Sequence, residues 1–173
     1  MAGNVLAPRS RGGPMVDPMT AHPEFVNIYK AFPAGYQATE ALEKELRAGP
    51  LDPALYELVK LRASQINGCA YCIDMHHKDA RFAGETEERL YMLPAWEEAT
   101  CYTAQERAAL ALTDAITLIS EQHVPAEVEA EARACFDEES YAALVFLIGT
   151  INLWNRLAIT AHSEPGRYVA RGR

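Results

Sequence analysis

The chain has 173 residues, enough for one domain with a buried core, and its 49% hydrophobic and 23% charged residues are typical of a soluble globular protein. Acidic residues outnumber basic ones by 24 to 16, and Lys and Arg form no run, so a nucleic-acid partner is not expected. The most apolar stretch, residues 141–153, is shorter than the ~20 residues of a membrane span, and the N-terminus lacks the apolar segment of a signal peptide. We therefore expect a cytoplasmic protein with no membrane contact.

The two ends of the chain differ in composition from its middle. The N-terminal segment is rich in Gly, Pro, Arg and Ser and carries no periodic apolar pattern. We expect residues 1–20 to form a disordered tail or leader, residues 21–165 to form one helical domain, and residues 166–173 to form a flexible C-terminal tail.

The first half of the domain carries helix signals. Residues 23–30 and 37–48 are predicted to form two short helices, the second of which ends at Gly49. A longer helix is predicted from Asp52 to about residue 66. Asp52 can cap the free N–H groups of its first turn, and Pro53 has no N–H to lose at the first helical position.

A tight helical hairpin is predicted after this helix. Asn67 and Gly68 can take the left-handed conformation that ends helices. The next helix should begin near Cys69 and reach about residue 83, with Gly84 as its stop. The Cys-X-X-Cys pattern therefore stands at the start of a helix.

The second half of the chain is also helical by pattern. Thr103 and Glu106 form a capping box, and the helix expected after Asp137 is apolar on most sides, so it should be central or lie in a subunit interface. No segment alternates apolar and polar residues as a half-buried strand does. We therefore predict an all-α fold, a single-domain helical bundle. The later helices are expected at residues 87–92, 95–99 and 103–119, from about residue 125, and from about residue 138.

Cys69, Cys72 and His76 carry the chemistry of the helix after the hairpin. Positions i, i+3 and i+7 lie on one face of an α-helix, so the three side chains can touch. Cysteine reacts as its thiolate, which a helix N-terminus, an imidazolium or a second thiol favours. A peroxidase needs one thiolate to attack the O–O bond and a second thiol to form a disulfide with the resulting sulfenic acid. The pattern indicates a redox-active thiol pair.

Glu57 joins this group only if the hairpin is antiparallel. Residues equidistant from the turn then face each other, which brings Glu57 within about one turn of His76. The carboxylate would orient His76, and His76 would draw the proton from Cys72. Periodicity alone predicts something else, because Glu57 lies off the apolar stripe of its helix and would be a solvated carboxylate.

Four other polar or aromatic residues are expected to serve structure. Arg62 falls inside the apolar stripe of its helix, and a buried arginine needs a carboxylate or carbonyl partner. His77 points about 100° away from His76 and should be exposed. Trp154 and Asn155 could line the pocket or a subunit contact, but an aromatic residue on a long apolar helix is more often in the core, so we favour packing.

The stretch from Glu57 to His76, ELVKLRASQINGCAYCIDMH, resembles the core of the alkylhydroperoxidase D-like proteins in the carboxymuconolactone decarboxylase superfamily. The shared pattern is Glu, eleven residues, Cys-X-X-Cys, three residues, His, and this chain matches it at each of those positions. Segments 106–112 and 151–156 are also similar to single-domain members. The resemblance therefore covers about residues 20–165.

This resemblance implies an all-α protein that reduces hydroperoxides without a cofactor or metal and assembles as a homo-oligomer, a trimer or hexamer. It implies Cys72 as the attacking thiol, Cys69 as the resolving thiol, and a proton relay through His76 and Glu57. A dithiol protein, thioredoxin-like or lipoyl-bearing, would reduce the disulfide. Tyr71 stands where better-known members can carry a histidine, so no role of that histidine carries over.

Other interpretations fit part of the pattern. Cys69, Cys72 and His76 are suitable zinc ligands, with Glu57 or His77 as a fourth, which would make a zinc-binding or redox-sensing module without turnover. A purely structural pair of buried cysteines is another. A lactone decarboxylase of the same superfamily would need proton transfer and no thiols, but members of that type generally lack the cysteine pair.

Overall fold

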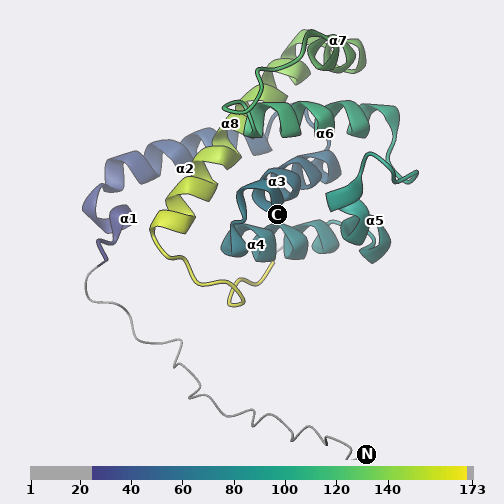
Figure 1. The fold of residues 1–173 in the computed structure, drawn as a ribbon. Helices are drawn as coiled ribbons and strands as arrows, with labels where there is room; N and C mark the ends of the chain where they lie inside the picture. Colours follow the sequence, from purple (N-terminus) through teal and green to yellow (C-terminus); the bar gives the residue numbers. More distant parts are fainter. Residues whose placement is uncertain (1–24, 171–173) are drawn as a thin grey trace, which may run out of the picture.

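The computed structural model describes residues 25–170, and every regular element within them is a helix (Figure 1). The predicted all-α fold is confirmed. The tail expected at residues 1–20 lies outside the described residues. The elements are α1 (Ile28–Ala31), α2 (Pro33–Arg47), α3 (Pro53–Asn67), α4 (Ala70–Phe82), α5 (Glu87–Met92), the 3-10 helix η1 (Leu93–Ala95), α6 (Ala104–Thr117), α7 (Ala126–Cys135) and α8 (Glu138–Thr160).

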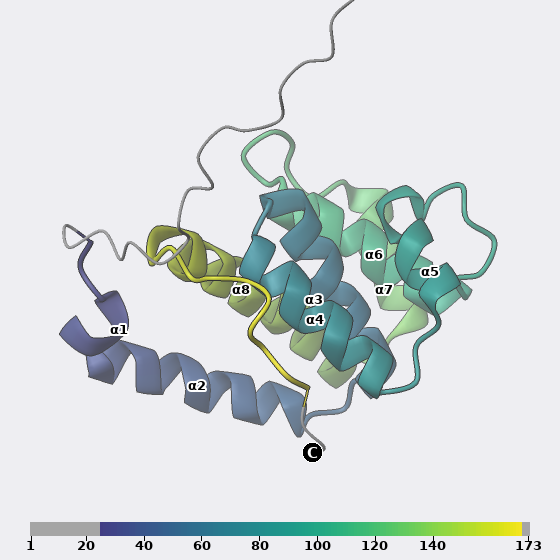
Figure 2. The ribbon, with the colours of Figure 1, turned by 90° about the horizontal axis from the view of Figure 1, so that it is seen from below.

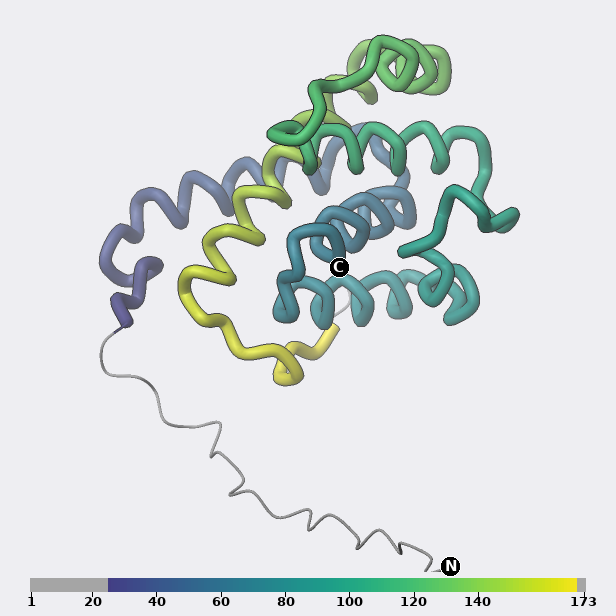
Figure 3. Tube along the Cα trace, in the orientation of Figure 1, coloured from purple at the N-terminus to yellow at the C-terminus, as the bar shows by residue number. Residues whose placement is uncertain are grey.

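Helix α3 lies at the centre of the bundle (Figures 1 and 3). It packs against α4, α6 and α8, while α2 packs against α8. Nine of the 15 residues of α3 are buried, and they include the charged Glu57 and Lys60. A helix covered by three neighbours has little surface left for solvent, so the solvated Glu57 predicted from periodicity is wrong.

Local chemistry determines the ends of the α3–α4 hairpin as predicted. Oδ1 of Asp52 accepts hydrogen bonds from the N–H groups of Ala54 and Leu55, at 2.9 and 3.2 Å. Gly68 ends α3 in the left-handed conformation with φ 67°, which glycine adopts without strain. The chain then turns directly into α4, whose N-cap is Cys69.

Helix α2 begins at Pro33, earlier than the predicted start at residue 37. Proline is favoured at the first helical position because its missing N–H would have no partner there. Gly35 lies in the first turn of α2, close to the ring of Phe32. Any other residue would place its Cβ 2.5 Å from this ring and force the ring to move. The helix predicted at residues 23–30 is the short α1, whose N-cap is Asn27.

The helix predicted at residues 95–99 is wrong, since only η1 and turns are found there. The guanidinium of Arg107 donates hydrogen bonds to the carbonyl oxygens of Trp96, Glu97 and Ala99, at 2.8 to 3.0 Å. In a helix the carbonyl groups line up along the axis. These three carbonyl groups instead converge on one side chain of α6, so their residues do not form a helix. The capping box of Thr103 and Glu106, in contrast, is confirmed.

Three clusters of buried apolar side chains form the core of the described residues, and α3 contributes to the two larger ones. By length and composition α8 could cross a membrane, but it packs against α2, α3 and α6 inside the bundle. Its Phe146 and Leu153 remain exposed, at 61% and 42%. The largest cluster contains Leu46, Leu51, Leu55, Tyr56, Val59, Ala109, Leu112, Ala132, Phe136, Leu144, Leu147 and Ile148, and the second contains Leu58, Leu61, Ala80, Leu90, Leu93, Trp96, Tyr102 and Leu110.

After α8 the chain returns across α4 as a C-terminal strap (residues 163–170; Figure 2). Lys78 Nζ donates to the carbonyl oxygen of Tyr168 at 2.9 Å. The hydroxyl of Tyr168 donates to Asp79 Oδ1 at 2.7 Å. Hydrogen bonds therefore join α4 to residues 166–170, which the sequence assigned to a flexible tail.

Candidate active site

Cys69 and Cys72 form a disulfide at the N-terminus of α4, with their Cα atoms 5.4 Å apart. Both residues are buried, and they pack against Ala158 of α8 and Tyr71. The N–H of Cys72 also donates to Cys69 Sγ at 3.4 Å, so this sulfur caps the helix. The two thiols that the helical spacing predicted to be neighbours are thus in direct contact.

Glu57 and His76 meet across the α3–α4 hairpin. Glu57 Oε2 lies 2.9 Å from His76 Nδ1, and both side chains are at most 1% exposed. The other oxygen of Glu57 lies 3.6 Å from Nη1 of Arg47 on α2. The structure therefore brings together the two residues whose proximity rested on an antiparallel hairpin.

Burial and charge determine the protonation of this pair. Burial raises the pKa of Glu57, but the hydrogen bond with His76 and the charges of Lys60 and Arg47 outweigh it, so the net pKa is lowered. Burial and the charge of Lys60 lower the pKa of His76, more than Glu57 raises it. We therefore assign a carboxylate and a neutral imidazole.

The tautomer of His76 follows from this assignment. An ionised carboxylate only accepts hydrogen bonds, so the proton of the imidazole is on Nδ1 and Nε2 carries the lone pair. His76 Nε2 is buried and has no hydrogen-bond partner among the described residues. It is therefore free to accept a proton. No hydrogen bond within residues 25–170 joins it to Cys72, one turn away on α4.

A partly buried ion pair, Lys60–Glu43, lies beside the Glu57–His76 pair, and the sequence analysis missed it. Glu43 of α2 accepts hydrogen bonds from Lys60 Nζ, from the hydroxyl of Tyr56, and from Trp154 Nε1 at 3.2 Å. Burial raises the pKa of Glu43, but Lys60, Tyr56 and Arg47 lower it to about 2. A charged residue on a mostly apolar helix, such as Lys60, was the available signal.

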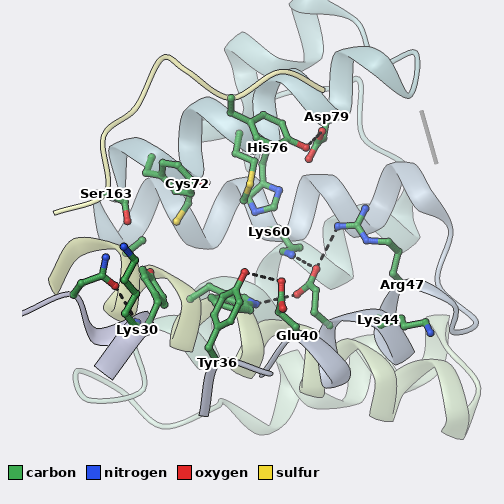
Figure 4. A pocket seen from close by; sticks show the side chains of 18 residues that line it. Lys30, Tyr36, Glu40, Lys44, Arg47, Lys60, Cys72, His76, Asp79 and Ser163 are labelled. Carbon is green, nitrogen blue, oxygen red and sulfur yellow. Dashed lines mark hydrogen bonds and ion pairs between the residues drawn. The ribbon is translucent and has the colours of Figure 1, made fainter. Parts of the chain in front are cut away.

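A cavity of about 740 Å³ opens between α2, α4, α8 and the C-terminal strap (Figure 4). Cys72 and His76 face it from α4, and Tyr36 and Arg47 face it from α2 (Figure 4). Trp154, which was expected to pack in the core, is half-buried and lines this cavity. Of the predicted site residues, Cys72 and His76 line the cavity, while Cys69 and Glu57 are buried and do not line it.

The remaining predictions have mixed outcomes. Arg62 has the expected carboxylate partner, because its Nε and Nη2 donate to Asp114 at 2.7 and 2.6 Å. His77 was expected to be exposed but is half-buried, with Nδ1 2.9 Å from the carbonyl oxygen of Ile73. Asn155 is fully buried in the bundle, as a packing role predicts.

Comparison with known proteins relates the chain to one family. The model of the carboxymuconolactone decarboxylase family matches residues 33–115. The uncharacterized protein YdfG of Bacillus subtilis is 46% identical over 134 residues, which cover 78% of this chain and 91% of YdfG. The chain belongs to the carboxymuconolactone decarboxylase family.

Solved structures resemble this family member over most of its length. A protein of unknown function from Agrobacterium tumefaciens, for which a role as the antioxidant defence protein AhpD has been suggested, is 39% identical with a TM-score of 0.79; the match covers 83% of this chain and 98% of that one. The debrominase Bmp8 has the same fold, with a TM-score of 0.72 at 22% identity over 80% of this chain and 74% of its own. The protein is thus an alkylhydroperoxidase D-like member of a family that includes enzymes, on a fold that supports more than one reaction.

One grouping within residues 25–170 has the geometry to hold a cation. Ligand atoms of Glu57, His76 and Asp79 lie within 4.8 Å of one another. This grouping contains neither cysteine, and it differs from the Cys-Cys-His zinc site considered from the sequence. The guanidinium of Arg47, 3.6 Å from Glu57, adds a positive charge that opposes a cation there.

Proposed function

We propose that the protein is a thiol-dependent peroxidase that reduces an organic hydroperoxide at Cys72 and closes the Cys69–Cys72 disulfide. The observation that carries the proposal is the arrangement at the N-terminus of α4. Two sulfurs in bonding contact lie beside a cavity that His76 lines, and Glu57 contacts His76 at 2.9 Å. Membership in a family that includes enzymes supports turnover at this site.

The first chemical step is the attack of Cys72 on the peroxide. His76 Nε2, directly or through a water molecule, takes the proton of the thiol, and the thiolate attacks the distal oxygen of ROOH. The O–O bond breaks, Cys72 becomes a sulfenic acid, and the leaving alkoxide takes the proton from His76 to give ROH. Glu57 holds His76 in the required tautomer and stabilises its charged form.

The second step closes the disulfide. The thiol of Cys69 displaces the hydroxyl group of the Cys72 sulfenic acid, so the S–S bond forms and water leaves. Two thiols are oxidised while one hydroperoxide is reduced to an alcohol and water. A dithiol protein, thioredoxin-like or lipoyl-bearing, then reduces the Cys69–Cys72 disulfide and becomes a disulfide itself.

We also propose the cellular location and the oligomeric state of the enzyme. We place it in the cytoplasm, where a disulfide is usually transient and catalytic rather than structural. We also propose a homo-oligomer, a trimer or hexamer. Exposed apolar side chains on α2 and α8, among them Leu42 and Phe146, support a contact between copies of the chain.

Peroxide consumption by three variants tests the proposal. With excess dithiothreitol, the wild type and Cys101→Ser should consume organic hydroperoxide at equal rates, because Cys101 lies outside the thiol pair. Cys72→Ser should reduce the rate to background. After dithiothreitol is removed, Cys69→Ser treated with hydroperoxide should accumulate a sulfenic acid that dimedone labels. Consumption by Cys72→Ser at the wild-type rate would refute the proposal.

The same variants separate the alternatives. A lactone decarboxylase needs no thiol, so Cys72→Ser would keep its activity on a lactone substrate. A zinc module would contain stoichiometric zinc after purification without chelator. Cys69→Ser and Cys72→Ser would both lose this zinc. We expect neither result.

A further inference from the structure

The size of the cavity beside Cys72 exceeds what hydrogen peroxide needs. The cavity measures about 740 Å³. A peroxide of two oxygen atoms fills about the space of two water molecules, each with a share of roughly 30 Å³ in the liquid. Cavities of roughly 300–1,000 Å³ are typical of sites for larger organic ligands. The volume therefore favours a bulky organic substrate.

Five aromatic side chains from different elements form the lining that we call the aromatic wall. The rings of Tyr29 and Tyr36 meet edge to face with centroids 5.4 Å apart, and those of Tyr36 and Trp154 do so at 5.9 Å. Rings in such contact present a continuous apolar surface on which another ring can stack. The aromatic wall consists of Tyr29, Tyr36, Tyr71, Trp154 and Tyr168.

Polar atoms of three of the five rings of the aromatic wall are bonded to the protein. The hydroxyl of Tyr36 donates to Glu40 Oε1 at 2.6 Å. The hydroxyl of Tyr168 donates to Asp79, and Trp154 Nε1 donates to Glu43. These bonds hold the rings in place, so the rings offer their faces and edges to a ligand more than their polar ends.

Two cations of the cavity lining, Lys60 and Arg47, are also paired. Lys60 and Arg47 both form ion pairs with Glu43, and Arg47 also pairs with Glu57. The two other lysines of the lining, Lys30 and Lys44, are exposed to solvent. A charged substrate inside would lose its hydration and find these cations occupied, which disfavours a charge on the substrate.

The aromatic wall lies next to the reactive sulfur. Tyr71 precedes Cys72 in the chain, and both pack with Ala158 of α8. Trp154 is four residues, about one turn, before Ala158 on the same helix, which is about 6 Å along its axis. When a ligand ring stacks on Trp154, a short substituent on that ring can therefore reach Cys72.

We infer that the cavity binds an uncharged, ring-bearing organic hydroperoxide, whose ring the aromatic wall holds while its O–O group reaches Cys72. This inference rests on the proposed function and specifies the substrate class. Cys72 takes the distal oxygen, the ring-bearing alcohol leaves with a proton, and Cys69 and the external dithiol complete the cycle as above.

Comparing three peroxides across matched variants tests the inference. Wild-type kcat/KM for cumene hydroperoxide should exceed that for hydrogen peroxide and tert-butyl hydroperoxide by about tenfold or more. Tyr36→Leu should lower the cumene value about three- to tenfold, the equivalent of one aromatic contact, and leave the hydrogen peroxide value within about twofold. Tyr36→Phe keeps the ring and should keep the preference. Tyr91→Leu, an exposed tyrosine on α5, is the matched control and should behave as wild type.

A binding measurement separates this inference from the peroxidase proposal. The alcohol product, 2-phenyl-2-propanol, should quench tryptophan fluorescence of Cys72→Ser with a Kd about three- to tenfold weaker after Tyr36→Leu. Equal kcat/KM for all three peroxides, or equal effects of Tyr36→Leu and Tyr91→Leu, would overturn the ring-bearing substrate and leave the peroxidase intact. Binding of the alcohol without turnover of any peroxide would overturn the peroxidase and, with it, the hydroperoxide as substrate.

Discussion

His76 Nδ1 and Glu57 Oε2 lie 2.9 Å apart, although Glu57 precedes His76 by 19 residues and comes from the other arm of the α3–α4 hairpin. The contact assigns the proton to Nδ1 and leaves Nε2 as a base beside the cavity. The carboxylate is thus a positioning group: it acts on the thiol only through the imidazole.

Replacing Glu57 by glutamine should therefore lower activity without removing the hydrogen bond. The amide can donate to Nδ1, which moves the imidazole proton to Nε2 and leaves no base facing the cavity. We expect kcat/KM for hydroperoxide to fall on the order of 10²- to 10⁴-fold, the usual contribution of general base catalysis.

The control for this variant is Glu45→Gln, an exposed carboxylate on α2 outside the cavity lining. It should keep full activity. Circular dichroism and the unfolding midpoint check that Glu57→Gln is folded. A folded Glu57→Gln with wild-type kcat/KM would contradict the positioning role.

The pKa of His76 should respond to the neighbouring ion pair. Burial and the charge of Lys60 hold this pKa below 6.5. Neutral His76 is the active form, so activity should persist as the pH falls through 6.5 and decline only below the folded-state pKa. The linked effect on stability has the same sign: below about pH 6.5 the unfolded chain binds more protons than the folded one, so the folded state loses stability as the pH falls.

Removing Lys60 together with its partner tests this dependence. Lys60→Met alone leaves Glu43 buried without its ammonium, so the double variant Lys60→Met/Glu43→Gln is the better choice. Loss of the Lys60 charge raises the pKa of His76 by more than loss of the Glu43 charge lowers it, so the acid limb of kcat/KM should move to higher pH. NMR titration of the His76 ring measures the same shift without turnover, and an unchanged midpoint would rule out the influence of Lys60.

Sequence reasoning succeeded where the determinant is local. Helix α3 begins after Asp52, which caps its first turn, and ends at Gly68, which adopts the left-handed conformation. Both effects depend only on residues nearby in the sequence. Helical spacing alone placed Cys69 and Cys72 together, since three residues on one helix suffice for contact. A carboxylate or carbonyl partner for Arg62 was predicted for a similar reason, because an arginine within an apolar stripe requires one, and Asp114 is that partner.

Long-range contacts set the limit of that reasoning. The partner of Lys60 is Glu43 on another helix, and no periodic pattern links the two positions. Glu57 was located from the family pattern, while its own helix indicated solvent, because periodicity cannot show that three neighbours cover α3. Residues 166–170 looked like a tail because their bonds go to α4, which is distant in sequence.

The C-terminal strap should loosen when Lys78 is replaced. Lys78 Nζ donates to the carbonyl oxygen of Tyr168 at 2.9 Å and to Asp74 Oδ2 at 2.8 Å. One hydrogen bond contributes about 1 kcal/mol, so Lys78→Met should speed amide exchange within residues 163–170 by about fivefold. Arg133→Met on the exposed face of α7 is the control and should leave exchange unchanged. Equal exchange in both variants would show that Lys78 does not hold the strap.

The pairing of Arg62 with Asp114 should make a measurable contribution to stability. The two form a bidentate contact at 2.7 and 2.6 Å between α3 and α6, and Trp96 Nε1 donates to the same carboxylate at 3.1 Å. Arg62→Met leaves a half-buried carboxylate without its cation, and we expect a loss of about 2–3 kcal/mol in the free energy of unfolding.

A double-mutant cycle measured by urea unfolding isolates this ion pair. Arg62→Met/Asp114→Leu removes both charges, so it should be less destabilised than the sum of the two single variants, with a coupling energy of about 1–2 kcal/mol. The exposed Arg133→Met should change stability by less than about 0.5 kcal/mol, as surface substitutions usually do. Strict additivity of Arg62→Met and Asp114→Leu would show that the two side chains do not stabilise each other, and that packing of the arginine stem alone explains its place in the apolar stripe.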